Sequence, residues 1–185
     1  DVAEFAGSVG ILFSFRCVWT RCRFMLVGQG WFYIWEQLMS DERVVELDGF
    51  NVMVRGRDAL YIANKNDVYV GRALIQYGEY GQNEYDLLEK LVFPGACVLE
   101  VGAHIGSHTV RLAKKIGLKG RLVAVEPQPP LFQAMAGTMA LNGLMNVDCY
   151  PFALGETAKT TLLPAVDYRQ ENNFGGLSLL NPPSS

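Results

Sequence analysis

The stretch VLEVGAHIGSHTV, residues 98–110, decides the fold that this sequence predicts. A short apolar run ends at Glu100, glycines follow at positions 102 and 106, and a helix-forming stretch begins near Ser107. Glycine lets the chain turn sharply without a Cβ clash, and the first turn of a helix leaves backbone N–H groups without partners. The pattern therefore predicts a strand, a glycine turn and a helix whose positive end faces the turn.

The alternation of strand and helix continues after this stretch. Residues 121–127 and 147–154 are apolar, strand-like runs, and residues 129–143 between them have helical character. Such alternation predicts right-handed βαβ units and a parallel sheet. We therefore expect an α/β fold with a Rossmann-like parallel βαβαβ core, which binds its ligand beyond the carboxyl ends of the strands. Residues 157–166 are consistent with one further strand, and residues 167–185 with a loop.

The chain before this core predicts a small sheet and two helices. Two β-prone runs flank Asp48-Gly49, which is a hairpin signal, and a third run follows Asp58. We therefore expect a small antiparallel β meander over residues 43–63. Apolar residues then recur at helical spacing over residues 68–77 and 85–92.

Residues 1–40 are apolar and aromatic, but Arg16, Arg21 and Arg23 interrupt them. No apolar span of about 20 residues exists there, and the arginines follow the apolar run where a signal peptide would place them before it. A buried N-terminal apolar helix is the favoured interpretation, and the alternatives are a segment that docks on a membrane surface or a partner and a segment whose proper context is missing. The expected division of the chain is an apolar segment at 1–40, a β meander at 41–66 and a ligand-binding domain at 67–185.

Composition excludes some classes of protein. The chain has 185 residues, a net charge of −3 and no run of Lys or Arg, so we expect no nucleic acid among its partners. The four cysteines, Cys17, Cys22, Cys97 and Cys149, form no C-x-x-C pair. We expect Cys97 and Cys149 to be reduced and buried in strands, which favours a cytoplasmic protein.

Two acids suggest which ligand the glycine turn binds. Glu126 ends the second strand of the core, where a carboxylate accepts both hydroxyls of a ribose. The dinucleotide pattern G-x-G-x-x-G is absent because His104 takes its middle position, and Glu100 would repel a phosphate. S-adenosylmethionine, a nucleoside with a cationic amino-acid head and no phosphate, fits these residues. A metal site at Glu100, His104 and His108 is the weaker alternative, and we expect no metal.

These motifs resemble a known family. The segments VLEVGAHIGSHTVRLAKKIG, GRLVAVEPQPPLFQAM and LNGLMNVDCYPFALGE are similar to the first half of an FkbM-type S-adenosylmethionine-dependent methyltransferase. The resemblance runs from about Asp67 to about Ser178 and includes the approach segment YGEYGQNEYDLLEKLVFPG. It implies a Rossmann-like class I methyltransferase core, S-adenosylmethionine as cofactor, and methyl transfer to an oxygen of a small molecule or sugar.

The resemblance also implies roles for individual residues. Glu100 and the loop 102–107 would hold the methionine end, Glu126 the ribose, and the segments 128–130 and 152–153 would lie near the adenine. The approach segment around Tyr80 to Glu84 would close over the cofactor. The expected cofactor-binding residues are Tyr80, Glu84, Glu100, Gly102, Ala103, His104, Gly106, Ser107, His108, Glu126, Pro127, Gln128, Phe152 and Ala153.

The sequence departs from the family at three points. The family commonly has Asp in place of Glu100 and Asn in place of His104. The family's later segment of the form K-I-D-x-E-G-x-E is absent, so we expect this chain to hold the N-terminal half of the domain, incomplete at the C-terminus. A non-catalytic cofactor-binding or interaction module is therefore the alternative function. The catalytic residues cannot be named from the sequence, and the acid at Glu100 argues against a nicotinamide-dependent oxidoreductase.

Overall fold

The computed structural model describes residues 43–47 and 49–178, and the chain divides into two compact units, Asp1–Val45 and Glu46–Ser185. The expected helix in residues 1–40, the turn residue Asp48 and the cysteines at positions 17 and 22 lie outside the described residues. The described elements are β1 (Val44–Glu46), β2 (Asn51–Arg55), β3 (Leu60–Asn64), α2 (Val70–Tyr77), α3 (Gln82–Leu91), β4 (Cys97–Val101), α4 (Ser107–Ile116), β5 (Arg121–Val125), α5 (Pro129–Leu141), β6 (Val147–Tyr150) and the short 3-10 helix η2 (Phe174–Gly176).

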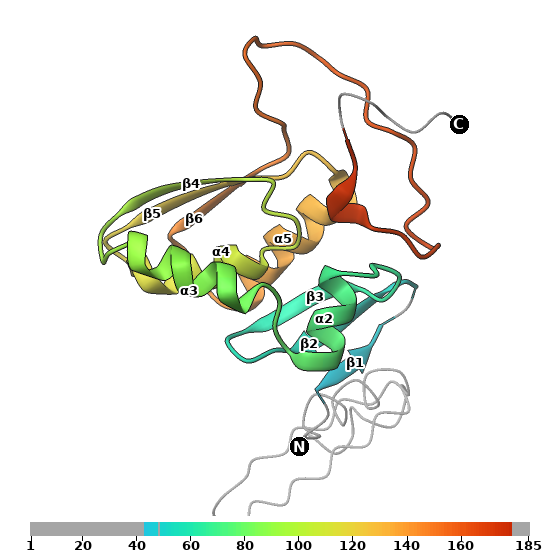
Figure 1. Ribbon diagram of the computed structural model, residues 1–185, viewed down its shortest axis with the longest axis horizontal. Coiled ribbons are helices and arrows are strands. Elements are labelled where there is room, and N and C mark those ends of the chain that lie inside the picture. Colours follow the sequence, from blue (N-terminus) through green and yellow to red (C-terminus); the bar gives the residue numbers. More distant parts are fainter. Residues whose placement is uncertain (1–42, 48, 179–185) are drawn as a thin grey trace, which may run out of the picture. The chain divides into compact units, whose positions relative to one another are not determined.

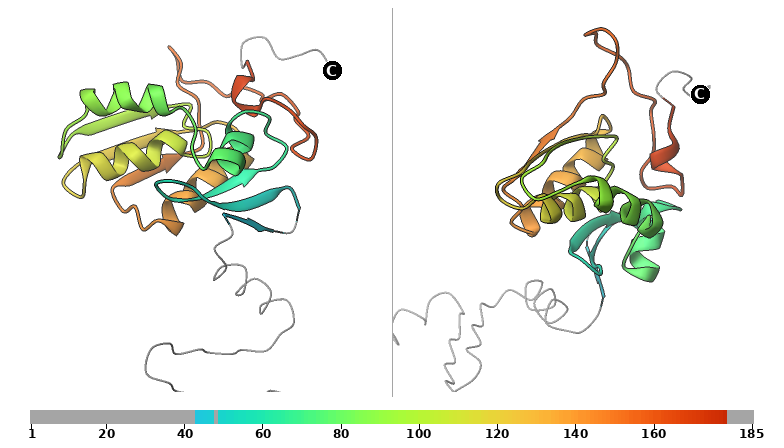
Figure 2. Two further views of the ribbon diagram at one scale, coloured as in Figure 1. Left: turned by 60° about the horizontal axis from the view of Figure 1, so that its bottom comes forward. Right: turned by 60° about the vertical axis from the view of Figure 1, so that its left-hand side comes forward.

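The core of the second unit is a parallel three-stranded sheet in the order β4-β5-β6. Leu99 pairs with Val123 and Val123 with Asp148, so the strands run in register from β4 to β6. Helices α3, α4 and α5 lie on one side of this sheet (Figures 1 and 2). The connectivity β4-α4-β5-α5-β6 confirms the expected α/β fold with a Rossmann-like core.

A smaller sheet, in the order β1-β2-β3, precedes this core, which confirms the expected β meander. Its strands β2 and β3 are antiparallel, with Met53 opposite Ile62. Side chains at the C-terminal end of α5 bond to the edge of β3: the amide of Asn142, which follows the helix, bonds to both backbone groups of Leu60, and the Ile62 N–H donates to Thr138 Oγ1 at 3.1 Å. These bonds satisfy backbone groups that an edge strand would otherwise leave without partners.

The other face of the parallel sheet is not covered by any described helix. Leu99 and Val101, which alternate with helix-facing residues along β4, are 59% and 57% exposed. Cys97 shares their face and is exposed, and Cys149 is half-buried, so the prediction that both are buried is wrong. The prediction assumed that helices cover both faces, as is usual for parallel sheets.

The chain after β6 differs from the expectation in two ways. The third strand ends at Tyr150, and residues 157–166 form no strand, because no described strand lies beside them to accept their backbone hydrogen bonds. Residues 167–178, expected to be loop, include η2, and Phe174 is fully buried. None of the described helices is long and apolar enough to cross a membrane.

Candidate functional site

A cavity of about 450 Å³ lies at the carboxyl ends of β4 and β5. Its lining contains all the residues expected from the sequence to bind the cofactor, with the exception of Gly106. The glycine turn, the end of β5 and the approach segment are thus brought together, as expected for parallel strands whose carboxyl ends meet at one edge. The lining also includes residues that the sequence did not indicate: Val70, Val101, Val125, Leu154, Gly175 and Leu177.

The two glycines of the turn have different surroundings. Both have positive φ, 76° at Gly102 and 86° at Gly106, which favours glycine. A Cβ at Gly102 would meet no atom within 4 Å, because that side of the residue faces the cavity. A Cβ at Gly106 would lie 2.7 Å from Met139 Cε, so Gly106 permits the close approach of α5.

We expect Gly106→Ala to lower the free energy of unfolding by about 2 kcal/mol. This loss is the sum of the cost of placing alanine in a left-handed conformation and the cost of displacing the Met139 side chain. Gly102→Ala carries the backbone term alone and serves as the matched control, with an expected loss of about 1 kcal/mol. Urea unfolding followed by circular dichroism measures both. Equal losses in the two variants would contradict the packing role of Gly106.

Glu126 is held by the backbone of two loops. Its Oε2 accepts the His104 N–H at 3.0 Å and its Oε1 accepts the Gln128 N–H at 2.9 Å. The residue is buried, and burial raises the pKa of its carboxyl while the two N–H donors lower it. Each carboxylate oxygen keeps a second lone pair, so the carboxylate can accept further hydrogen bonds from a ligand in the cavity.

Glu100 presents one carboxyl oxygen, Oε2, without a hydrogen-bond partner among the described residues. Its Oε2 is shielded from solvent and no described atom bonds to it. Burial raises the pKa of Glu100 to about 7, and the nearby Thr109 hydroxyl acts in the opposite direction. A buried carboxylate oxygen without a partner is unfavourable unless a cation approaches it, so this group is suited to an ammonium ligand.

His104 joins the glycine turn to the start of α2. Its φ of 56° lies in the left-handed region, where Asn, Asp and His are enriched among residues other than glycine. Its Nε2 is 3.5 Å from Oδ2 of the buried Asp67, which also accepts the N–H groups of Tyr69 and Gly71. Burial lowers the pKa of His104, while the Asp67 carboxylate opposes that shift. Asp67 gave no signal in the sequence because it acts across 37 residues.

The approach segment meets the start of α4 at the cavity. His108 Nε2 lies 3.2 Å from Glu84 Oε2, and the rings of His108 and Tyr80 are 6.2 Å apart between centroids. Ser107 is the first residue of α4, and no side chain caps that helix. Its free N–H groups therefore remain available to an anionic group of a ligand. Among the described residues, no cluster of three or more His, Cys, Asp or Glu is placed to hold a metal ion.

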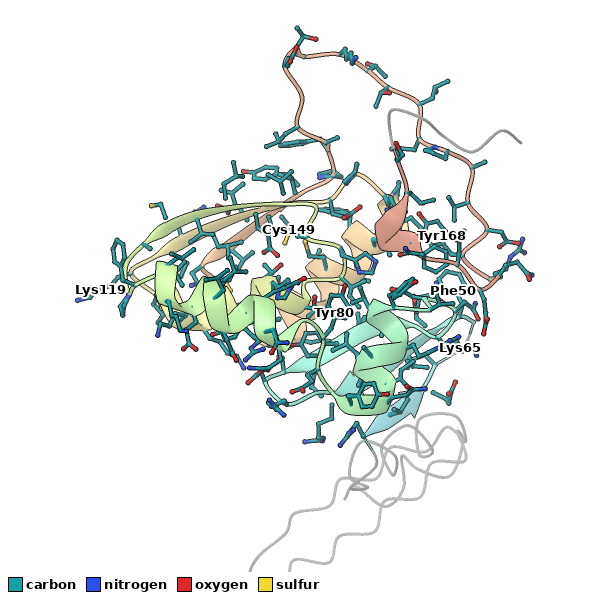
Figure 3. The ribbon with its side chains drawn as sticks, viewed as in Figure 1. Phe50, Lys65, Tyr80, Lys119, Cys149 and Tyr168 are labelled. Atoms are coloured by element: carbon teal, nitrogen blue, oxygen red, sulfur yellow. The ribbon has the colours of Figure 1, made fainter. Side chains whose placement is uncertain are left out.

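The side chain of Gln128, expected near an adenine, is already used within the protein. It accepts a hydrogen bond from the Tyr168 hydroxyl at 2.8 Å and donates one to the Phe174 carbonyl at 2.9 Å. Figure 3 shows Tyr168 beside η2, near the start of α5. Phe152 and Ala153, which follow β6, line the cavity and are exposed.

Acidic side chains line the cavity without basic Lys or Arg side chains among the described residues. Three carboxyl groups, of Glu84, Glu100 and Glu126, face the cavity, and none of the described residues that line it is Lys or Arg. The cavity therefore suits a ligand that is cationic or neutral, and it disfavours one that carries phosphate.

Comparison with known proteins gives matches among solved structures alone: no model of a known protein family matches the chain, and no curated protein matches it. A SAM-dependent methyltransferase from Aquifex aeolicus is 28% identical over 45% of this chain and 42% of its own, with a TM-score of 0.34. TYW2 of M. jannaschii, solved in complex with AdoMet, is 20% identical over 57% of this chain and 44% of its own, with a TM-score of 0.41.

A tRNA m1G37 methyltransferase of M. jannaschii is 14% identical over 60% of this chain and 32% of its own, with a TM-score of 0.42. Another matched structure is a complex of aTrm5 with tRNALeu. The exclusion of nucleic acid from the expected partners is therefore wrong, because bulk charge reports the whole surface and not the partner of one site. The chain spans less than half the length of each of these solved structures.

Proposed function

We propose that the cavity binds S-adenosylmethionine and that the chain is part of an FkbM-type methyltransferase, with a ligand-binding domain at residues 67–185. The observation that carries this proposal is the set of carboxyl groups of Glu84, Glu100 and Glu126 in a cavity lined by no described Lys or Arg. S-adenosylmethionine has free ribose hydroxyls, an ammonium group and a sulfonium, and it has no phosphate.

The residues fit this ligand part by part. The Glu126 carboxylate, fixed by two backbone N–H groups, would accept the ribose hydroxyls. The Glu100 carboxyl, whose Oε2 lacks a partner, would hold the ammonium group, and the free N–H groups at the start of α4 would hold the α-carboxylate. Pro127 and Phe152 would lie along the adenine.

The cofactor supplies an activated methyl group, so the protein's contribution is mainly to orient it toward the acceptor and to exclude water. We propose an oxygen nucleophile on a small molecule or sugar as the acceptor, on the basis of the sequence resemblance to the FkbM type. The alternative function, a cofactor-binding module without catalysis, shares the cavity and differs in its lack of methyl transfer.

Calorimetric titration tests the ligand class. We expect S-adenosylhomocysteine, which keeps the ribose and the amino-acid head, to bind the full chain with a Kd in the micromolar range. We expect NAD to bind at least about a hundredfold more weakly, because its pyrophosphate would face the three carboxyl groups. Tighter binding of NAD would favour an oxidoreductase, and no binding of either ligand by the folded chain would refute the cofactor site.

A further inference from the structure

The segment of residues 167–177, which we call the C-terminal strap, is fastened to the cavity although residues 151–166 before it are mostly exposed. Its backbone pairs with the turn before α2: the Asn172 N–H donates to the Asn66 carbonyl at 3.0 Å, and the Val68 N–H donates to the Asn172 carbonyl at 3.0 Å. The Tyr168 carbonyl accepts the side-chain amides of Asn64 and Asn66 at 2.9 and 3.1 Å.

The strap also forms part of the cavity wall. Gly175 and Leu177 line the cavity, and Phe174 between the strap's two ends is fully buried. The rings of Phe174 and Tyr168 pack with their centroids 4.7 Å apart. Figure 1 shows the strap, at the red end of the colour bar, returning beside the start of α5.

Gln128 connects the strap to the acid at the end of β5. Its amide binds the Tyr168 hydroxyl on one side and the Phe174 carbonyl on the other, while its backbone N–H donates to Glu126. A single residue thus bonds to both ends of a loop of the strap and to the carboxylate that faces the cavity. The Tyr168 and Phe174 hydrogen bonds use one lone pair and one N–H of this amide and fix its orientation, so its orientation depends on the strap.

We propose that Tyr168 and Gln128 are positioning residues, which hold the C-terminal strap as a wall of the cavity and fix the Glu126 carboxylate for a nucleoside ligand. This inference rests on the proposed function for the identity of the ligand. Neither side chain needs to touch the ligand, because the wall is formed by Gly175 and Leu177 and the hydrogen bonds to the ligand by Glu126.

The first arm of the test uses the full chain without ligand. Tyr168→Phe keeps the ring that packs on Phe174 and removes one hydrogen bond, which leaves the Gln128 Oε1 without its donor. We expect hydrogen exchange at the Asn172 and Val68 amides to quicken about fivefold in this variant. Tyr77→Phe, a substitution at an exposed tyrosine of α2, is the matched control and should leave both amides unchanged.

The second arm measures the dissociation rate of S-adenosylhomocysteine by stopped flow. We expect about a fivefold faster dissociation in Tyr168→Phe and in Gln128→Met, with little change in the association rate. The double variant should lose no more than Gln128→Met alone, because both substitutions break the same contact. If the substitutions only lowered the overall stability, their effects would instead add in the double variant. The change would then not be confined to the dissociation rate.

The two arms separate the possible failures. Unchanged exchange in Tyr168→Phe overturns the fastening role of the hydroxyl. Faster exchange with an unchanged dissociation rate overturns the positioning role. If the wild-type chain binds no S-adenosylhomocysteine, the proposed function and the nucleoside part of the inference both fail, whereas the exchange arm still decides whether Tyr168 and Gln128 hold the strap.

Discussion

Replacing Glu126 by alanine is expected to weaken the binding of S-adenosylhomocysteine by about a thousandfold. Hydrogen bonds to a charged group contribute about 1.5–3 kcal/mol each, and the two ribose hydroxyls would both lose their acceptor. The His104 and Gln128 N–H groups, which donate to this carboxylate at 3.0 and 2.9 Å, would also lose their partner. The expected loss of affinity therefore has two causes: the ligand loses its hydrogen bonds to the carboxylate, and the loops that carry His104 and Gln128 are held less firmly.

Glu126→Gln separates these two contributions only in part. Each oxygen of the carboxylate accepts one backbone N–H, but the side chain of glutamine has only one oxygen. Its NH2 group would therefore point at one of the two backbone N–H donors. We therefore expect the glutamine variant to bind almost as poorly as the alanine variant. Isothermal titration calorimetry measures both, with circular dichroism as the check on folding.

Glu156→Gln is the matched control for this substitution, because Glu156 is an exposed acid that does not line the cavity. We expect this variant to bind as the wild type does. A loss of less than threefold in Glu126→Ala would show that the carboxylate does not hold the ligand, and it would leave the glycine turn as a structural connection alone.

Replacing Glu100 by glutamine is expected to stabilise the chain without ligand at pH 8 by up to about 3 kcal/mol. Burial raises the pKa of this carboxyl from 4.5 to about 7, so the folded state disfavours the charged form. The folded state then binds more protons than the unfolded state between these two values, and stability falls as the pH rises from about 4.5 to about 7. One unit of pKa corresponds to about 1.4 kcal/mol, which gives the stated limit.

Urea unfolding at pH 5 and pH 8 measures this difference. The gain of Glu100→Gln over the wild type should be small at pH 5 and reach its full size at pH 8, because glutamine does not titrate. The exposed control Glu156→Gln should give the same small difference at both values of pH. If Glu100→Gln raised the free energy of unfolding equally at pH 5 and pH 8, the Glu100 carboxyl would ionise as freely in the folded chain as in the unfolded one.

The same substitution should weaken the binding of S-adenosylhomocysteine, because it removes the carboxylate proposed to hold the ammonium group. Stability and affinity would then change in opposite directions at one residue. A cation in the cavity offsets the cost of burying the Glu100 carboxylate. Without a cation, that cost lowers the stability of the folded chain.

The sequence predicted the features that depend on short spacings. Glu100 and the glycines at 102 and 106 lie on one strand and one turn, so the order of residues alone brings them together. Glu126 joins them because the carboxyl ends of neighbouring parallel strands share an edge, which is a rule of the fold. The cavity residues on the glycine turn and after β5 could therefore be found without coordinates.

The features that were missed depend on contacts between distant segments. Tyr168 reaches Gln128 across 40 residues, and Asp67 reaches His104 across 37, with no periodic pattern to mark either pair. The strand expected at 157–166 failed for the same reason, since β-propensity has an effect only where a neighbouring strand accepts the hydrogen bonds. The exposure of Cys97 likewise depends on which helices cover the sheet.

The left-handed backbone of His104 has a consequence for how such sites are found by motif. What Glu126 needs from position 104 is an N–H aimed at its carboxylate, which the main chain provides whatever the side chain is. Glycine, asparagine and histidine all adopt this conformation, so the position can change identity while the acid keeps its donor. A search pattern that demands glycine in the middle of the turn would overlook this chain, whereas one written in terms of backbone conformation would include it.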